Sequence, residues 1–278
     1  MDGLSMFKMI ADQARQGQLV FPTHLEQTLK LKQMLDDPDC HAETASKLIS
    51  TDPLLSARIV AVANSSAYNR SGNSISNIRT AVSRLGFSQT KILVTALIVR
   101  QLNQQLRDPV LIAKARQLWE HTAHVAALAQ VIARHITRVD PDTATFAGLI
   151  HEVGGFYMIS CAGQYPGILD SENEAWSEYG EKLIGRGVLQ QLEIPQHVID
   201  AVEFMWKGLA AYPPESLGDT LILANDIAPV SSPLHQHLSP AMQLHTAHLN
   251  FEVEDSTLQE ILQEKDEEIH SLSHALLA

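Results

Sequence analysis

Apolar residues return at helical spacing along nearly the whole chain, and this periodicity restricts the fold more than any other feature. His121, for example, is followed at positions four, seven and eleven further on by apolar residues of the same helix face, Val125, Leu128 and Ile132. No stretch shows sustained two-residue alternation with β-branched enrichment, so we expect little or no sheet. The sequence therefore predicts an all-α protein.

Aspartate-proline pairs mark where several of these helices begin. Asp52-Pro53, Asp108-Pro109 and Asp140-Pro141 each join a capping carboxylate to a proline in the first helical turn. The longest helical pattern starts just after Asp108-Pro109 and runs to about residue 136. We therefore place a boundary there, between an N-terminal helical subdomain (1–108) and a second helical subdomain (109–250), which pack together. An acidic tail (251–278) follows.

The charge balance excludes direct nucleic-acid binding as the expected function. The net charge is −12, and the tail alone carries eight acids against Lys265. Neither the tail nor the mildly acidic remainder offers the positive field that non-specific nucleic-acid binding needs. Two cysteines suit a reducing compartment, and we see no signal sequence and no apolar run of membrane-spanning length. We expect a soluble, cytoplasmic protein with no membrane partner.

The tail is predicted to form a helix with one apolar seam. Five apolar residues follow heptad spacing, interrupted by Lys265 at one core position: Leu258, Leu262, Ile269, Leu272 and Leu276. Two interpretations stay open for this seam. It forms a homodimer or docking element, or it packs on the protein's own body.

One segment suggests chemistry. Residues 145–155 place a His-Glu pair, His151 and Glu152, inside an apolar helix, among glycines at 148, 154 and 155. Such small residues allow another helix to approach closely. The periodicity also points His121 into the core from its own helix. Inward histidines on two closely packed helices can meet.

Several segments, in order, carry a family resemblance. The most specific runs from Leu48 to Tyr68 and contains Asp52-Pro-Leu-Leu-Ser-Ala-Arg58, and three others are 75–97, Leu118-Trp-Glu-His121 and Phe146-Ala-Gly-Leu-Ile-His-Glu-Val-Gly154. Across residues 18–228 the chain resembles HDOD-domain proteins, bacterial signalling relatives of the HD metal phosphohydrolases. The resemblance implies an N-terminal helical bundle packed on an HD-like helical bundle, and a regulatory role in signal transduction.

The resemblance also implies where metal ligands would lie. The HD pattern uses a His on one helix, a His-Asp pair on the next and a distant Asp, and the corresponding residues here are His121, His151, Glu152 and Asp226. The pair is thus degenerate, since Glu152 replaces Asp and adds one methylene. Where HD relatives with a second metal carry further histidines, this chain has Glu181 and the pair Phe204-Met205, and Gly155 replaces a frequent lysine. We therefore expect no complete dinuclear site.

Two interpretations of the four residues remain open. They hold one divalent ion (manganese, iron or zinc), or they form a vestigial, hydrogen-bonded cluster in which each histidine pairs with a carboxylate and nothing binds. The departures favour the second, and hence no cofactor. A weaker zinc candidate is the group of later histidines, His235, His237, His245 and His248, for which a polar loop is the default.

Two functions from different classes follow. The favoured one is a non-catalytic regulatory module that relays a signal by binding another protein, or a small ligand such as a nucleotide, in the cleft between its two helical subdomains. The alternative is a mononuclear metal-dependent phosphohydrolase acting on a nucleotide or another phosphoester. The site departures favour a protein that is not an enzyme.

Overall fold

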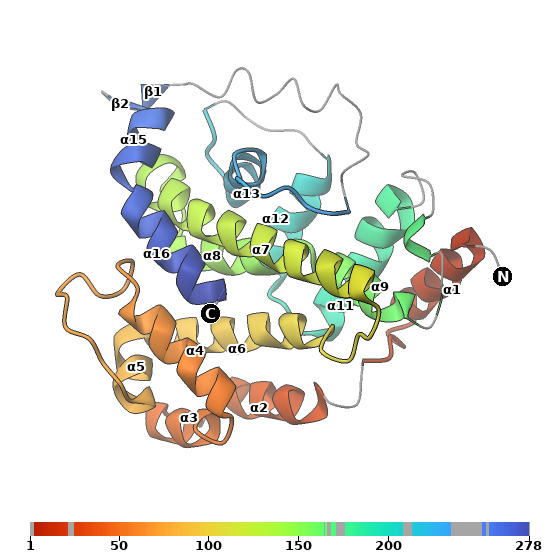
Figure 1. Ribbon diagram of the computed structural model, residues 1–278, viewed down its shortest axis with the longest axis horizontal. Helices are drawn as coiled ribbons and strands as arrows, with labels where there is room; N and C mark the ends of the chain where they lie inside the picture. The colour runs from red at the N-terminus through yellow and green to blue at the C-terminus, as the bar shows by residue number, and fades with distance from the viewer. Residues whose placement is uncertain are drawn as a thin grey trace.

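A computed structural model describes residues 3–21, 25–163, 165, 168–170, 176–207, 213–234, 252–253 and 256–277. Over these residues the regular structure is helical, apart from one antiparallel pair of two-residue strands, β1 (Glu252–Val253) and β2 (Ser256–Thr257). The prediction of an all-α protein with little sheet is confirmed. Figure 1 shows two packed groups of helices, and α6 of the first group contacts α8 and α9 of the second.

The first group contains five helices in sequence order: α2 (Glu26–Asp36), α3 (Ala42–Ile49), α4 (Pro53–Asn64), α5 (Ile78–Leu85) and α6 (Phe87–Gln101). Asp52 accepts a hydrogen bond from the Leu55 N–H and so caps α4, as the aspartate-proline pattern predicted. Gly86 separates α5 from α6 with φ of 82°, a backbone conformation that glycine adopts without strain. The two helices therefore meet at 110°.

The second group begins with α7 (Pro109–Ile132), which ends in a π-helical turn, η2 (Ala133–Thr137). It continues with α8 (Pro141–Ile150), α9 (Val153–Ala162), the short 3-10 helix η3 (Ile168–Asp170), the π-helix η4 (Trp176–Gly185), α11 (Arg186–Gln191), α12 (Gln196–Lys207) and α13 (Leu217–Asp226). Asp108 and Asp140 cap α7 and α8 by accepting from the N–H groups of Val110 and Thr143. The predicted helix starts are thus confirmed.

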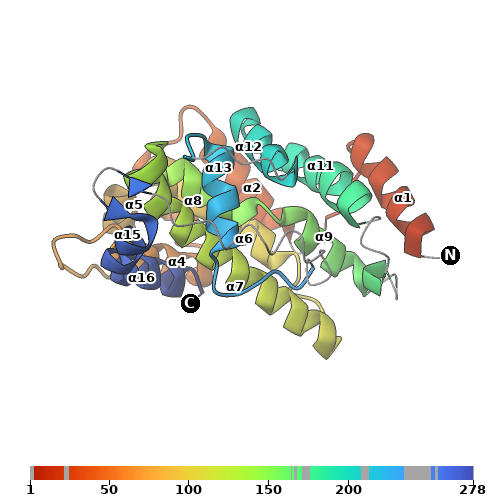
Figure 2. The same ribbon diagram turned by 90° about the horizontal axis from the view of Figure 1, so that it is seen from above.

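Helix α1 (Gly3–Arg15) lies away from the other N-terminal helices. Figure 2 shows it beside α11, and it also contacts η4. The approach is close at Gly187, where an added Cβ would lie 2.6 Å from the Cβ of Ala14. The first helix of the chain therefore packs on helices of its C-terminal half.

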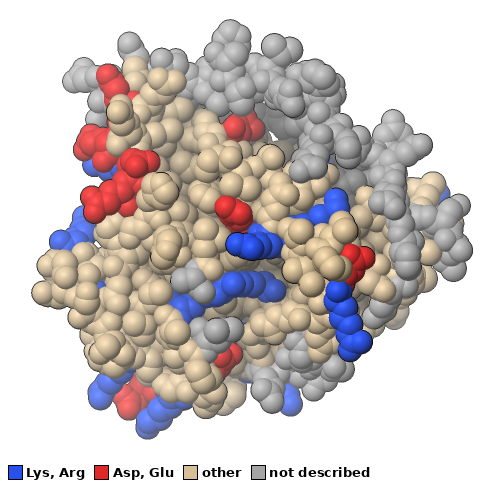
Figure 3. All heavy atoms as spheres, viewed as in Figure 1, with Lys and Arg blue, Asp and Glu red and all other residues tan. Residues whose placement is uncertain are grey.

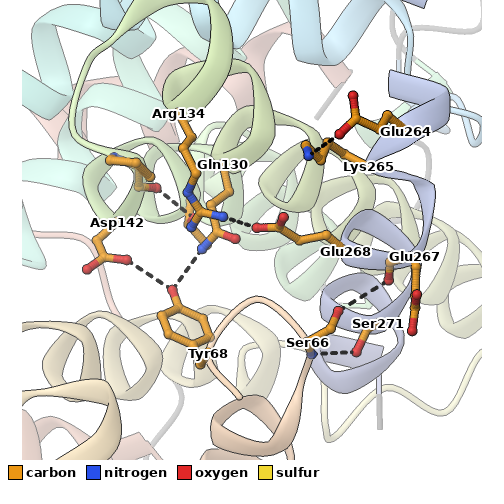
Figure 4. A network of polar contacts seen from close by, with 12 residues as sticks. Ser66, Tyr68, Gln130, Arg134, Asp142, Glu264, Lys265, Glu267, Glu268 and Ser271 are labelled. Carbon is orange, nitrogen blue, oxygen red and sulfur yellow. Dashed lines mark hydrogen bonds and ion pairs between the residues drawn. The ribbon is translucent and has the colours of Figure 1, made fainter. Parts of the chain in front are cut away.

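The tail forms two helices, α15 (Leu258–Glu264) and α16 (Asp266–Leu277), which separate at Lys265. Helix α16 lies on α7 and α4, and Leu258, Leu272 and Leu276 are buried. Polar contacts fix it there (Figure 4): the Ser66 N–H donates to the Ser271 hydroxyl over 2.9 Å, and Arg134 pairs with Glu268. The apolar seam packs on the protein's own body, and a homodimer through this helix stays a prediction.

Among the described helices, no single one is long and apolar enough to cross a bilayer, and α5 and α6 reach that length only together, as a pair bent by 110°.

Candidate functional site

Helix α7 holds His121 on the face that the periodicity predicted. The side chain is 2% exposed, and Val125, Leu128 and Ile132 of the same face are buried with it. Helix α8 crosses this region closely, because an added Cβ at Gly148 would lie 2.6 Å from the Cα of Ala126 in α7. The predicted role of glycine in letting the two helices approach is confirmed.

His151 and Glu152 lie at a break between two helices, so the prediction that they sit inside one apolar helix was wrong. His151 is the C-cap of α8, and Glu152, with φ of −107° and ψ of 28°, precedes α9. The physical reason is local. The His151 Nδ1 bonds the Gly148 carbonyl over 2.7 Å, and two glycines of low helix propensity follow at 154 and 155. Gly154 in turn allows η4 to approach at Gly185.

This break brings three of the four predicted ligands together. His121, His151 and Glu152 each offer an atom within 4.8 Å of the others, and all three side chains are at most 6% exposed. The Nε2 atoms of the two histidines are 3.3 Å apart. The Glu152 carboxylate therefore reaches both histidines from the helix break.

The hydrogen bonds of the two Nδ1 atoms determine whether each Nε2 atom carries a lone pair. The Nδ1–H of His121 donates to the Val230 carbonyl over 2.7 Å, and the Nδ1–H of His151 donates to the Gly148 carbonyl. A histidine that donates through Nδ1 leaves Nε2 with a lone pair in the neutral ring. The expected pairing of each histidine with a carboxylate is not found for His121, whose ring nitrogens contact a carbonyl and His151. In two neutral rings these lone pairs face each other, and either a proton on one ring or a cation between the rings removes the repulsion.

The arrangement of His121, His151 and Glu152 fits a bound divalent metal ion. Ligating histidines commonly donate their second nitrogen to a backbone carbonyl, which fixes the tautomer and ring orientation. A tetrahedral ion at about 2.0–2.1 Å from each nitrogen would place the two nitrogens about 3.3–3.4 Å apart. The observed separation of 3.3 Å agrees with this value and is longer than a good hydrogen bond. The set of two imidazoles and one carboxylate suits zinc, iron or manganese.

The segment after α13 closes the cluster on one side. Val230 accepts from His121, and the Ser232 hydroxyl donates to Glu152 Oε2 over 2.9 Å with the serine 4% exposed. The Gln117 side chain of α7 also donates to the Ser231 carbonyl over 3.0 Å. Residues 228–234, which we call the closing loop, thus bond both α7 and the α8–α9 break. Sequence reasoning missed Ser232, because a serine in a polar loop carries no signal for this contact.

Asp226, the fourth predicted ligand, ends α13 and is partly exposed. Among the described residues it is not in the group of three whose ligand atoms lie within 4.8 Å of one another. The side chain of Glu181 lies outside the described part of the chain. The weaker zinc candidates His235, His237, His245 and His248 also fall outside the described residues.

Two of the three positions that would serve a second metal, Phe204 and Met205, are apolar. Phe204 of α12 packs against α13, since an added Cβ at Gly218 would lie 2.3 Å from its ring. Met205 packs against the main core. These side chains support helix packing where a dinuclear site would need nitrogen ligands.

Solved structures with the same fold include the following three proteins. A provisionally named metal-dependent phosphohydrolase from Shewanella amazonensis SB2B has a TM-score of 0.76 at 22% identity, covering 99% of each chain. An HDOD domain protein of unknown function from Geobacter sulfurreducens has 0.62 at 20%, covering 96% of each. A provisionally named signal transduction protein from Marinobacter aquaeolei VT8 has 0.56 at 17%, covering 92% of this chain and 60% of that one.

Identities this low establish the fold alone. Among curated protein sequences, none matches the chain. The model of the HDOD domain, in contrast, matches residues 21–207, which is more than half of the sequence. The expected resemblance is therefore confirmed, and the chain belongs to the HDOD domain family.

Proposed function

We propose that this protein is a non-catalytic regulatory module of bacterial signalling, which acts by binding another protein rather than by turning over a substrate. The observation that carries the proposal is the closure of the three-residue cluster by the protein's own loop. His121, His151, Glu152 and Ser232 are at most 6% exposed. Membership of the HDOD family and the signalling name of the relative from Marinobacter aquaeolei support the proposal.

Hydrolysis of a phosphoester by a metal centre needs an open position for water and room for the phosphate beside it. In this cluster, Val230 and Ser232 hold His121 and Glu152 from the side of the closing loop. Phe204 and Met205 occupy two of the three second-metal positions and cannot neutralise a phosphate. The arrangement therefore favours a structural role for the cluster over a hydrolytic one.

A divalent ion at this cluster would be held by the Nε2 atoms of His121 and His151 and by the Glu152 carboxylate. It would supply the positive charge that the two facing lone pairs lack, and its binding energy would add to folding energy. Because the ligands come from α7 and the α8–α9 break, and the closing loop bonds both, the chain's own residues join three segments at one point. Such a joint can stabilise the surface that a partner recognises.

The alternative is a mononuclear phosphohydrolase. Three ligand atoms within 4.8 Å of one another favour it, because glutamate is a competent ligand and one metal suffices to activate water. It requires the closing loop to move, so that substrate reaches the cluster. This requirement makes the two functions distinguishable by experiment.

The test compares hydrolysis by the full chain with that of a matched variant. We expect protein loaded with manganese, iron or zinc to hydrolyse p-nitrophenyl phosphate and bis(p-nitrophenyl) phosphate no faster than the His121→Ala variant loaded in the same way. The same variant should unfold at lower temperature than the wild type, which shows a structural contribution. Turnover that disappears in the variant would establish the phosphohydrolase instead.

A further inference from the structure

A cavity lies between α4, α6 and α7, apart from the histidine cluster. Its volume is about 290 Å³. On the face drawn in Figure 3, basic side chains gather around a hollow near the middle of the molecule, over the region between α6 and α7 in Figure 1. The lining is mostly apolar with several basic groups: Leu55, Arg58, Leu97, Arg100, Gln101, Asn103, Gln104, Ala115, Arg116, Trp119 and Phe156.

The charge of this lining is unbalanced. Three arginines, Arg58, Arg100 and Arg116, contribute to it and no aspartate or glutamate does, although the chain has a net charge of −12. Arg58 is only 5% exposed. Within the part of the chain that the structure describes, Arg58 and Arg100 make no ion pair. Buried cations without a counter-ion are costly, and proteins retain them where an anion binds.

The polar atoms beside the arginines also lack partners. The Nη1 of Arg100 and both polar atoms of the Asn103 side chain are buried and form no hydrogen bond with the described residues. Burial lowers the pKa of the Arg100 guanidinium, so its surroundings oppose the charge. The Trp119 ring, 5.3 Å from the guanidinium carbon, stabilises it only in part. Donors that remain unsatisfied at one wall of a cavity favour a ligand with several acceptor oxygens.

We propose that this cavity, the arginine pocket, binds a phosphate monoester that carries a small aromatic or apolar body. A phosphate monoester carries about −1.5 to −2 charges at pH 7, which matches two guanidinium groups, that of the buried Arg58 and that of the half-buried Arg100. A carboxylate would leave one cation uncompensated. The apolar wall, made by Leu55, Leu97 and Phe156, suits the body of the ligand, and the volume is near the lower end for small-molecule sites.

The pocket lies between the two groups of helices, and this position suggests what a bound ligand would do. Leu55 and Arg58 belong to α4 and Leu97 and Arg100 to α6, in the first helical group, whereas Trp119 and Phe156 belong to α7 and α9 of the second. A ligand between them would bridge the two groups and stabilise one packing of them. None of the lining residues belongs to the histidine cluster, so this inference goes beyond the proposed function and does not depend on it.

The first experiment is calorimetric titration of the full chain with phenyl phosphate and with adenosine 5′-monophosphate, with adenosine as the uncharged control. We expect saturable binding of at least one phosphate and none of adenosine. Arg100→Gln should weaken binding at least tenfold. Arg79→Gln should leave it unchanged, because Arg79 is exposed and pairs with Glu43 outside the pocket. Failure of both phosphates to bind at millimolar concentration would overturn the proposal.

A second measurement separates a ligand site from a merely structural arginine. Thermal unfolding is followed in phosphate buffer and in chloride of equal ionic strength. We expect phosphate to raise the unfolding midpoint of the wild type more than chloride does, and to lose this effect in Arg58→Met. In chloride, Arg58→Met should unfold at a higher temperature than the wild type, since it removes a buried charge without a counter-ion. A lower midpoint together with a retained phosphate effect would contradict the assignment.

Discussion

The histidine cluster and the arginine pocket are two buried polar sites with opposite needs. In the first, two imidazole Nε2 atoms and a carboxylate converge, which suits a cation. In the second, guanidinium groups converge without an acid in the lining, so the missing partner is an anion. Helix α7 contributes to both. His121 and Trp119 are two positions apart, which places them about 200° apart around the helix, on opposite faces.

The difference between the two sites lies in what surrounds them. The closing loop bonds His121 and Glu152, so the chain itself fixes the outer atoms of the cluster. In the arginine pocket, by contrast, the buried Nη1 of Arg100 and the Asn103 amide form no hydrogen bond with the described residues. A site whose surroundings are complete is suited to a structural ion, whereas a site with unsatisfied donors facing a cavity is suited to an exchangeable ligand. Four changes to the chain or its bound ions test this contrast.

The largest effect is expected from Gly148→Ala. The added methyl would lie 2.6 Å from the Ala126 Cα, and a backbone atom cannot give way as a side chain can. The variant should lose about 3 kcal/mol of unfolding free energy in denaturant titration. As a control, Gly163→Ala, where nothing lies within 4 Å of the added atom, should change stability little. Equal stabilities of the two variants would mean that α7 and α8 are not held this closely.

Removal of metal should give the next largest effect. If free metal is present at a hundred times its dissociation constant, the ion stabilises the fold by about 2.7 kcal/mol, and a chelator should abolish this contribution. The chelator should not affect His121→Ala, which lacks one ligand. Arg58→Met should respond as the wild type does, because the arginine pocket is separate. Elemental analysis should find about one ion per wild-type chain; a wild type without metal and without response would leave the cluster vestigial.

A smaller effect is expected from Ser232→Ala. The substitution removes the hydrogen bond to the Glu152 carboxylate, which is buried, and should cost about 1.5–2 kcal/mol in denaturant titration. It should also speed the loss of metal to a chelator, because the closing loop is released. Ser231→Ala is the matched control, since only the carbonyl of that residue is used in the bond with Gln117. If both variants lose metal at the wild-type rate, the loop does not close the cluster.

The smallest effect on stability is expected at a third cluster of polar side chains, formed by Tyr68, Asp142 and Gln130, in which Tyr68 bonds the other two directly. The Tyr68 hydroxyl donates to Asp142 over 3.0 Å and accepts from Gln130 over 2.9 Å (Figure 4). Burial, followed by the nearby charge of Asp140, raises the pKa of the Asp142 carboxyl above its ordinary value. The folded state therefore holds this proton to higher pH than the unfolded chain does, and ionisation costs stability as pH rises through the folded pKa.

Asp142→Asn should remove this cost and keep an acceptor for Tyr68. At pH 7 the variant should be more stable than the wild type by roughly 0.5 kcal/mol, since Asp142 is partly exposed and solvent screens the effect. The difference should vanish below about pH 3.9, where the carboxyl is protonated in both states. Thermal unfolding measured between pH 3 and pH 7 checks the sign. A variant that is less stable at pH 7 would show that the carboxylate is needed in its charged form.

Much of the fold could be predicted from local signals. Helical periodicity predicted the face of α7 that carries His121, and aspartate-proline pairs predicted where α4, α7 and α8 begin. The break at His151 and Glu152 could not be predicted, because its cause includes the bond from the His151 ring to a carbonyl of the preceding turn. The packing of α1 on η4 and α11 could not be predicted either, because it joins segments far apart in the sequence.

Side-chain spacing within one or two turns is enough to predict the helix class, the starts of the helices and which histidines point inward. Helix packing then brings the histidine Nε2 atoms to 3.3 Å from each other, Ser232 to Glu152, and Arg58 and Arg100 to one cavity. Each of these depends on contacts between distant segments, whose separation is set by helix packing. A sequence pattern shows which face of a helix is buried, but the atoms which that face contacts depend on the helix packed against it.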